Sequence, residues 1–538
     1  MLTIVAAALA VAAAEPADLV VENARIYTVN PKQPVARALA VKAGRIVAVG
    51  DSVSPYIGAG TKKIDARGLT LLPGLIDAHG HMRGLGALLD SVDLRNFKLA
   101  AVVEYVQAQA GQKPAGEWIT GRAWDQTNWG GAFPSAADLD VVSPDHPVYL
   151  TRVDGHAGWV NSKALALAGI TSSTPDPPGG RIMRDAQGRA TGILVDRAQG
   201  LVGSKIPPAT DAQVRPQLKR AAEECARLGL TGVHDAGIGR QDLNAYRSLL
   251  AAGELPLRIY AMIGGAGSLW DEYLKRGPEI GDSLTVRAIK LVADGAVGSR
   301  GAALWQSYTD DKGNSGLLIL DEPFIEKVAR QAVEHGFQVC THAIGDKANR
   351  AVLDAYAAAL GGKNDRRFRI EHAQVVSLPD FKLFQANSVV ASIQATHATS
   401  DLRWAEQRLG PDRVQGAYAW QRFLKLGIPV ANGSDFPVES PNPMLGFYAS
   451  ITRQDVNGNP PGGWFPDQKM SRQEALYSWT LGAAYAAFEE NMKGSLEPGK
   501  LADFVVIDTD IMQAPPAEIL AAKVTLTVLG GKVVHGRP

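Results

Sequence analysis

The sequence lacks the features that tie a chain to a disulfide scaffold. It contains two cysteines in 538 residues, Cys225 and Cys340, and neither lies in a CxxC pair. Two cysteines cannot build a disulfide framework, so we expect both to be buried apolar residues. They leave the redox compartment open.

The chain also lacks a net charge. Lys+Arg and Asp+Glu both total 55, and no long run of one sign occurs. A neutral chain creates no field that would attract a polyanion or an anionic bilayer. Nucleic acid and membrane are therefore not expected as partners, and a small-molecule substrate is.

Long hydrophobic runs are missing except at the start, where the chain reads MLTIVAAALAVAAAEPADLV. This stretch is too short and too rich in alanine to span a bilayer. It resembles the apolar part of a secretory signal, with small residues at 12–14 before Glu15. We predict a signal peptide over residues 1–14 and a periplasmic or secreted protein. Because a basic start is missing, an ordinary N-terminal segment and a cytoplasmic protein remain the alternative.

Both ends of the chain have β-type sequence. DLVVENARIYTV, ALAVKAGRIVAVG and KKIDARGLTLL mix β-branched residues with turn residues, and FVVIDTD and KVTLTVLGGKVVHG resume the pattern near the C-terminus. This texture predicts one small β-sandwich domain built from residues 15–72 and 490–538.

The middle of the chain, residues 73–489, repeats a short apolar run eight times. The runs are LTLLPGLID, TGVHDAG, LRIYAMIGG, VRAIKLVADG, QVCTHAIGD, FRIEHAQV, VVASIQATH and IPVANGSD. Helical patterns such as DEPFIEKVARQAVEHG and KANRAVLDAYAAALGG separate the later runs. Alternating strands and helices indicate an α/β protein with a (β/α)8 TIM barrel. The alternative, an open doubly wound sheet, would place a Gly-rich turn after the first strand, where this chain has HGH.

A long interval separates the first two runs, at about residues 84–212. It includes DPPGGRIMRDAQGRATGILVD, which is typical of a β-hairpin with Asp/Gly turns. We predict a β-containing insertion after strand 1 that lies over the mouth of the barrel.

Active sites of such barrels lie at the carboxyl ends of the strands. Six residues at or near these ends carry metal-binding or titratable side chains: His79, His81, Lys290, His342, His372 and Asp435. Imidazole and carboxylate suit zinc and similar divalent ions, and a bound water then becomes a hydroxide nucleophile near neutral pH. Asp435 is placed to act as the general base, although it could instead cap the NGSD turn.

Lys290 is unexpected beside a metal, because an ammonium repels cations. Burial lowers the pKa of a lysine, and the neutral amine can react with carbon dioxide to form a carbamate that bridges two ions. A simple ion pair with Asp294 is the alternative.

The segments GLIDAHGH, IKLVADG, CTHAIGD, IEHAQ, NGSDFPVE and GSLEPGKLADFVVID together resemble the amidohydrolase superfamily, in the branch (amidohydrolase family 3) that contains N-substituted formamide deformylase. The resemblance implies the same barrel and β-sandwich. It implies that His79, His81 and Asp435 hold one ion and that His342 and His372 hold another, bridged by carboxylated Lys290. Members differ in metal count, so one or two ions are expected. A homodimer is the assembly that the resemblance makes common.

Four further residues are candidate substrate contacts: His156, Trp124, Arg300 and His397. The alternative for each is structural: loop bracing for His156 and His397, core packing for Trp124, and a salt bridge for Arg300. His234 and Asp235, after the second run, are expected to support the site rather than to bind a metal.

These observations predict a metal-dependent amidohydrolase that acts on carbon–nitrogen bonds other than peptide bonds, such as formamides or N-acyl compounds. The alternatives are an ester or lactone hydrolase or a deaminase on the same site. A catalytically silent protein that holds a metal for binding or regulation is an alternative of another class.

Overall fold

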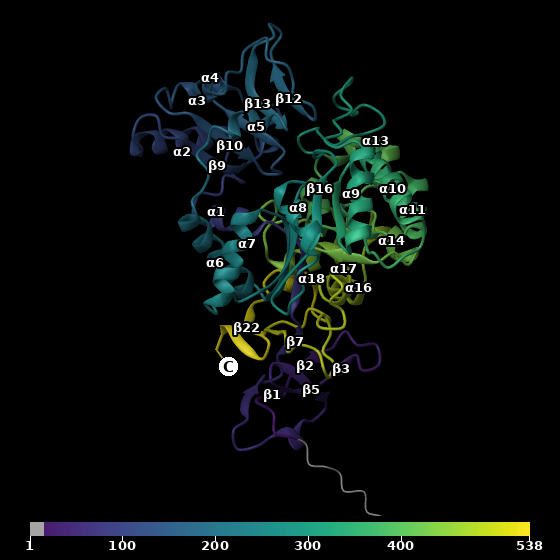
Figure 1. Cartoon of the computed structure of the whole chain (residues 1–538). Coiled ribbons are helices and arrows are strands. Elements are labelled where there is room, and N and C mark those ends of the chain that lie inside the picture. The colour runs from purple at the N-terminus through teal and green to yellow at the C-terminus, as the bar shows by residue number, and fades with distance from the viewer. Residues whose placement is uncertain (1–14, 538) are drawn as a thin grey trace, which may run out of the picture.

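The structure, a computed structural model, describes residues 15–537 (Figure 1). The predicted signal peptide, residues 1–14, lies outside the described residues. Figure 1 shows three regions one above another: an inserted region at the top, the barrel in the middle, and sheets from both ends of the chain at the bottom. Within residues 15–537, none of the helices combines the length and apolar character that crossing a bilayer requires.

Eight parallel strands form the central sheet, and neighbours in the sheet follow one another along the chain. They are β8 (Leu75–Gly80), β14 (Leu230–Ile238), β15 (Arg258–Gly264), β16 (Leu284–Val292), β17 (Gln338–Ala343), β18 (Arg369–His372), β19 (Val390–Ile393) and β20 (Val430–Asn432). The segment after β20 returns to β8: the Asp435 N–H donates to the His79 carbonyl oxygen at 2.7 Å, and Phe436 bridges Gly80. Each strand overlaps one of the eight predicted runs, so the predicted barrel is confirmed and the open sheet is excluded.

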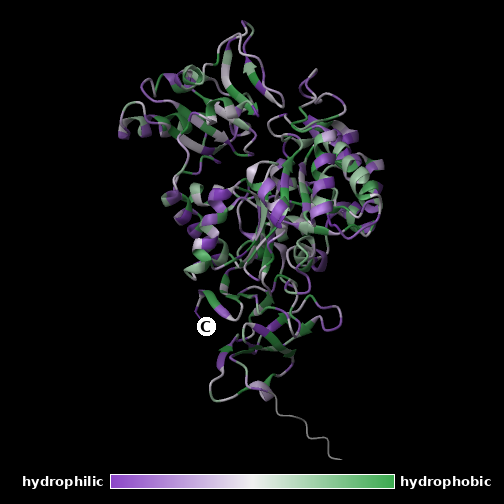
Figure 2. Cartoon of the chain, in the orientation of Figure 1, coloured by the Kyte–Doolittle hydropathy of each residue, from purple (hydrophilic) through white to green (hydrophobic). Residues whose placement is uncertain are grey.

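Helices surround the barrel (Figure 1). They are α1 (Met82–Leu89), α6 (Asp211–Arg227), α7 (Arg240–Ala251), α8 (Ser268–Arg276), α9 (Glu322–His335), α10 (Asp346–Leu360), α11 (Phe381–Ala386), α12 (Ala395–Asp401), α13 (Ala405–Arg413), α14 (Trp420–Lys425), α15 (Pro443–Thr452), α16 (Arg472–Ser478) and α17 (Leu481–Ala486). Their buried faces share one large core with the strands, and Figure 2 shows hydrophilic and hydrophobic residues alternating along them.

Helix α9 shows how the sequence sets helix ends. The Asp321 side chain accepts a hydrogen bond from the Phe324 N–H at its start, and Gly336 adopts a left-handed φ of 77° at its end. The predicted segment 321–336 therefore matches the helix and its two caps.

Two sheets lie near the ends of the chain: one is built from the N-terminal part alone, and the other combines strands from both ends. One has the order β5 (Arg45–Gly50), β4 (Ala38–Lys42), β1 (Leu19–Glu22), β6 (Lys62–Asp65); the other has β23 (Lys532–Gly536), β22 (Val524–Leu529), β21 (Phe504–Ile507), β7 (Thr70–Pro73), β2 (Arg25–Tyr27), β3 (Val35–Ala36). Strand β21 pairs antiparallel with β7, and one apolar core contains residues such as Val21, Phe504 and Val528. A β domain assembled from both termini is what the sequence predicted. The short helix α18 (Pro516–Ile519) lies between β21 and β22.

The inserted region is built on a five-stranded sheet. Its order is β12 (Gly180–Arg184), β13 (Ala190–Asp196), β11 (Ala157–Val160), β10 (Val148–Arg152), β9 (Ile119–Trp124), and it carries α2 (Leu99–Gln112), α3 (Ala136–Asp140), α4 (Ser162–Leu167) and α5 (Gln199–Gly203). Strands β12 and β13 form the predicted antiparallel hairpin. The predicted bounds of about 84 and 212 fall inside α1 and α6, which pack against each other beside the barrel.

Candidate active site

One cavity of about 710 Å³ collects the six predicted metal ligands at the carboxyl ends of the barrel strands. His79, Lys290, His342 and His372 lie in β8, β16, β17 and β18, while His81 follows β8 and Asp435 follows β20. Most of the remaining wall of the cavity comes from the inserted region and from the loops after β16, β19 and β20. The insertion thus covers the end of the barrel where the six side chains meet.

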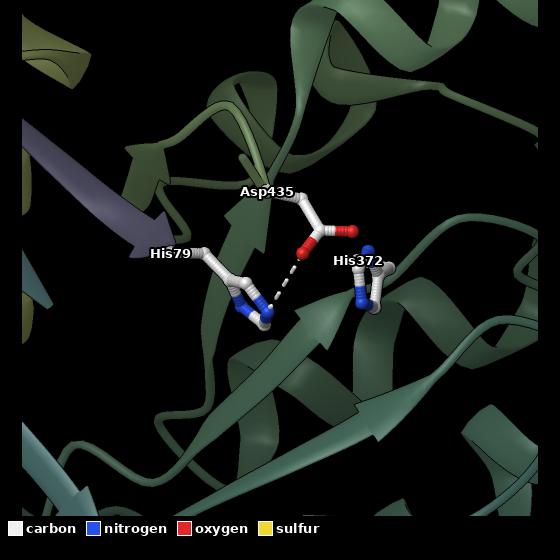
Figure 3. Close-up of side chains that lie close together, drawn as sticks. All are labelled: His79, His372 and Asp435. Carbon is white, nitrogen blue, oxygen red and sulfur yellow. Dashed lines mark ion pairs between the residues drawn. The ribbon is translucent and has the colours of Figure 1, made fainter. Parts of the chain in front are cut away.

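Three of the six approach one another closely. His79, His372 and Asp435 each offer a nitrogen or oxygen atom within 4.8 Å of the other two (Figure 3). The Asp435 Oδ1 atom lies 3.5 Å from the Nε2 atom of His79 and 3.0 Å from that of His81. Two or three imidazoles around one carboxylate oxygen are a donor set that suits a divalent transition metal.

His342 and Lys290 extend this group. The ring centroids of His342 and His372 lie 4.5 Å apart, and the Lys290 Nζ atom lies 3.2 Å from the His79 Nε2 atom. Asp294, the alternative partner for Lys290, instead accepts hydrogen bonds from three backbone N–H groups of neighbouring loops. Lys290 therefore points to the centre of the site and not to Asp294.

Glu371 orients His79, and sequence reasoning missed it. The Glu371 Oε2 atom lies 2.6 Å from the His79 Nδ1 atom, and Arg369 forms an ion pair with Glu371 at 2.7 Å. All three side chains are fully buried. Burial raises the pKa of the Glu371 carboxyl, but the charge of Arg369 and the contact with His79 outweigh it, so the pKa falls below its usual range. The resulting carboxylate accepts the Nδ1–H and leaves the Nε2 lone pair of His79 for the site.

The titration of the buried groups also suits a metal. Burial, followed by the charge of Lys290, lowers the pKa of His79 to about 4. Burial lowers the pKa values of His342 and His372 well below the usual value, and it lowers the pKa of the Lys290 amine. Neutral imidazoles are the form that binds a metal. Within residues 15–537, the buried Nδ1 of His372 and Oδ1 of Asp435 have no hydrogen-bond partner, so both atoms are available to a cation.

A buried turn fixes Asp435. The Asp77 carboxylate accepts hydrogen bonds from the Ser434 hydroxyl at 2.6 Å and from the His79 N–H at 3.1 Å. A Cβ at Gly433 would lie 2.6 Å from the backbone nitrogen of His79, so only glycine allows the two segments to approach this closely. His372 and Asp435 both have left-handed backbone, with φ of 73° and 58°. Such conformations cost energy and concentrate at functional sites.

Two of the four predicted substrate contacts line the cavity. His156 comes from the inserted region, with its ring 5.0 Å from that of His342 and its Nδ1 atom 2.7 Å from Asp196. His397 lies in α12 rather than at a strand end, because β19 stops at Ile393. The Nε2 atom of His397 lies 3.4 Å from the Oδ2 atom of Asp435.

The other two lie outside the cavity wall. Trp124 is fully buried in the core of the inserted sheet, where its Nε1–H donates to the Leu150 carbonyl oxygen at 2.9 Å. Arg300 forms an ion pair with Asp310 at 2.7 Å. For both residues the structure favours the structural alternative: Trp124 faces the core of its own sheet, and Arg300 pairs with Asp310.

His234 and Asp235 lie beneath the site. The His234 Nδ1 atom lies 2.9 Å from the Arg369 guanidinium, and Asp235 accepts hydrogen bonds from the Tyr246 hydroxyl and from the N–H of Met82. Both residues thus hold the groups that surround the predicted ligands.

Charged residues of the insertion were also missed as cavity wall. Arg122, Arg152 and Asp154 line the cavity from the inserted sheet, and Arg403 and Glu439 line it from barrel loops. Charged residues within segments of strand-like sequence, as in TGRAW and TRVDGH, were the pattern that could have indicated them.

Comparisons with known proteins identify the family of the chain. The model of the amidohydrolase family matches residues 62–535. "Protein LONG AFTER FAR-RED 3" of Arabidopsis thaliana is 35% identical, over 96% of this chain and 92% of its own length. N-substituted formamide deformylase of Arthrobacter pascens is 28% identical, over 97% of this chain and 98% of its own.

Among solved structures, an uncharacterized metal-dependent hydrolase from Pyrococcus horikoshii superposes with a TM-score of 0.75 at 27% identity, and the alignment covers 93% of this chain and 99% of the other. The family model spans most of the chain, and the fold extends over nearly all of it. The chain therefore belongs to the amidohydrolase family.

Proposed function

We propose that this protein hydrolyses an amide-type carbon–nitrogen bond of a small molecule with the help of a divalent metal. The observation that carries the proposal is the convergence of His79, His372 and Asp435, with His81 beside them, at the floor of a covered cavity. A relative that aligns along almost its full length is named for removing a formyl group from N-substituted formamides, which supports an amide-type substrate.

The donor set fits zinc, and His79, His81 and Asp435 would hold one ion. His342 and His372 would hold a second, with Lys290 between the two as a carbamate. When bound, such a metal polarises a carbonyl and makes water acidic enough to ionise near neutral pH.

Asp435 is the proposed general base. Burial raises the pKa of its carboxyl, but the close contacts with the His397 and His81 imidazoles outweigh burial and lower the pKa well below its usual value. The group is therefore a carboxylate at neutral pH. It takes a proton from the attacking water as the oxygen–carbon bond forms, and it returns the proton to nitrogen as the carbon–nitrogen bond breaks.

His156 and His397 place positive charge around the substrate. Burial lowers the pKa of His156, yet the hydrogen bond and charge of Asp196 outweigh it and raise the value to about 9. For His397, Asp435 and Glu439 outweigh burial and raise the pKa to about 10. Both imidazoles are protonated at neutral pH. The Nε2–H of His156 can donate to a substrate oxygen, whereas both ring nitrogens of His397 face carboxylates and its contribution is the charge alone.

The test is hydrolysis of a panel of formamides, N-acyl amino acids, esters and lactones by the zinc-loaded protein and by Asp435→Asn. We expect the substitution to lower turnover of the best substrate by about 10²–10⁴-fold, because it removes the base. Asp271→Asn, on the exposed face of α8, is the matched control and should keep full turnover.

Near-normal turnover by Asp435→Asn would contradict the proposal. Turnover of esters or lactones alone would favour the ester alternative. A retained metal without hydrolysis of any compound would favour a binding or regulatory protein.

A further inference from the structure

One arginine in the cavity wall has no partner. Arg122 lies in β9 of the insertion and lines the cavity together with His79 and Asp435. Its Nε atom is buried and donates to no acceptor among residues 15–537. Burial lowers the pKa of the guanidinium, while the more distant charges of Asp435 and Asp154 raise it. The guanidinium has therefore lost part of its water without gaining a hydrogen-bonded anion, and a ligand that supplies an anion would remove this cost.

Each of the other cavity arginines contacts a carboxylate. Arg95 lies 3.6 Å from Asp93 and donates to the Pro437 carbonyl oxygen at 2.7 Å. Arg152 forms ion pairs with Asp125 at 2.9 Å and with Asp154 at 2.5 Å. Arg403 forms an ion pair with Asp125 at 2.7 Å. Asp125 and Asp154 are therefore engaged by other cations, and within residues 15–537 Arg122 is the cavity arginine whose guanidinium forms no ion pair.

We infer that Arg122 binds a carboxylate of the substrate, so that the enzyme acts on amides that carry one negative charge, such as N-acylated amino acids. This inference rests on the proposed hydrolysis and names its substrate class. The planar guanidinium fork matches a carboxylate through two parallel hydrogen bonds. A dianion such as a phosphate fits less well, because Asp154 and Asp435 face the same cavity and would repel the second charge.

The position of Arg122 gives it a role in specificity. It belongs to the insertion, whereas the predicted metal ligands belong to the barrel. A substrate that spans the cavity would place its amide at the barrel end and its carboxylate at the insertion. A substrate without the carboxylate would leave the half-buried Arg122 guanidinium without a counter-charge, and a site built for a polar partner discriminates against the analogue that lacks it.

The test uses two substrates that differ only in the distal group. They are an N-acyl amino acid and the same compound with its carboxylate converted to a carboxamide. For the zinc-loaded wild type we expect kcat/KM to favour the carboxylate by at least about tenfold, and Arg122→Gln should bring this ratio close to one. Arg181→Gln, an exposed arginine on β12 of the same inserted sheet, removes the same charge and should keep the wild-type ratio.

Several outcomes would overturn the inference. Equal or better turnover of the carboxamide by the wild type would do so while leaving the proposed hydrolysis intact, as would an unchanged ratio in Arg122→Gln. If Arg122→Gln fails to fold, Arg122→Lys replaces it: the charge stays but the fork is lost, and the ratio should fall. If the wild type hydrolyses neither compound, the wider panel decides the proposed hydrolysis, and calorimetric binding of the two compounds decides the inference. Stronger binding of the carboxylate supports it, and equal binding rejects it.

Discussion

Glu371 differs from the predicted metal ligands because it contacts His79 on the ring nitrogen that faces away from the cavity. Its carboxylate contacts the outer nitrogen of His79 at 2.6 Å and Arg369 at 2.7 Å, in a region closed to water. A carboxylate in this place fixes the tautomer and the ring orientation of a ligand and makes it more basic. The metal affinity of the site should therefore depend on a residue that never reaches the metal.

We expect Glu371→Gln to weaken metal binding by about 10–100-fold, because a neutral amide orients and polarises His79 less well. Chelator competition with zinc, followed by metal analysis of the protein, measures the change. Arg369→Gln is the matched control, since it breaks the same buried ion pair but leaves Glu371 beside His79. Equal loss of metal in the two variants would show that stability, and not the orientation of His79, sets the affinity.

At the residue scale, chemistry that stands at the end of a strand could be predicted, and chemistry inside a strand could not. His79, His81 and Asp435 interrupt apolar runs at their carboxyl ends, where a barrel builds its site. Glu371 and Arg369 lie two residues apart within a run. Because strand residues alternate, they share a face, and their opposite charges were the unused indication of a buried pair. Arg122 was missed because its meaning depends on how the insertion lies over the barrel.

Close contact between elements depends on single glycines. Helices α1 and α6 pack against each other, and a Cβ at Gly86 in α1 would lie 2.2 Å from the Gln217 carbonyl oxygen in α6. A methyl group cannot fit at that distance, so the helices would have to separate. Helix α1 directly follows His81, and its position affects the first strand of the site.

We expect Gly86→Ala to lower the free energy of unfolding by about 1–3 kcal/mol through overpacking. Gly111→Ala in α2 is the opposite control. Gly111 is exposed and its Cβ would meet no atom within 4 Å, so alanine should stabilise the helix by about 0.4–1 kcal/mol. Urea unfolding measures both. A Gly86→Ala protein as stable as the wild type would show that the two helices adjust freely.

At the element scale, the sequence predicted the alternation of strands and helices better than the residues at which they begin and end. The run LTLLPGLID contains two strands: β7 joins the terminal sheet, β8 joins the barrel, and Gly74 between them packs against Thr231. No periodicity marks this division, because both strands are fully buried. The sequence predicted one run that ends at His397. In the structure β19 ends at Ile393, and the rest of the run, including His397, lies in α12.

At the scale of the whole molecule, a buried ion pair joins the terminal sheets to the barrel. Arg258, the first residue of β15, forms two contacts of 2.6 and 2.8 Å with Asp503, which directly precedes β21. Asp503 also accepts a hydrogen bond from the Gly530 N–H at 2.7 Å. The carboxylate therefore links a barrel strand to two segments near the C-terminus, and the stability of the two regions should be coupled.

We expect Asp503→Asn to lower the free energy of unfolding by about 3–5 kcal/mol, because it leaves the Arg258 guanidinium buried without a counter-charge. The ten tryptophans of the chain all lie between residues 118 and 479, so their fluorescence reports on the barrel and the insertion and not on the terminal sheets. If the regions are coupled, Asp503→Asn shifts the fluorescence midpoint in urea together with the circular dichroism midpoint. Glu272→Gln, which breaks an exposed ion pair with Arg240, should change stability by less than about 1 kcal/mol. A fluorescence midpoint that stays at the wild-type value while circular dichroism shows earlier loss of β structure would mean that the terminal sheets unfold on their own.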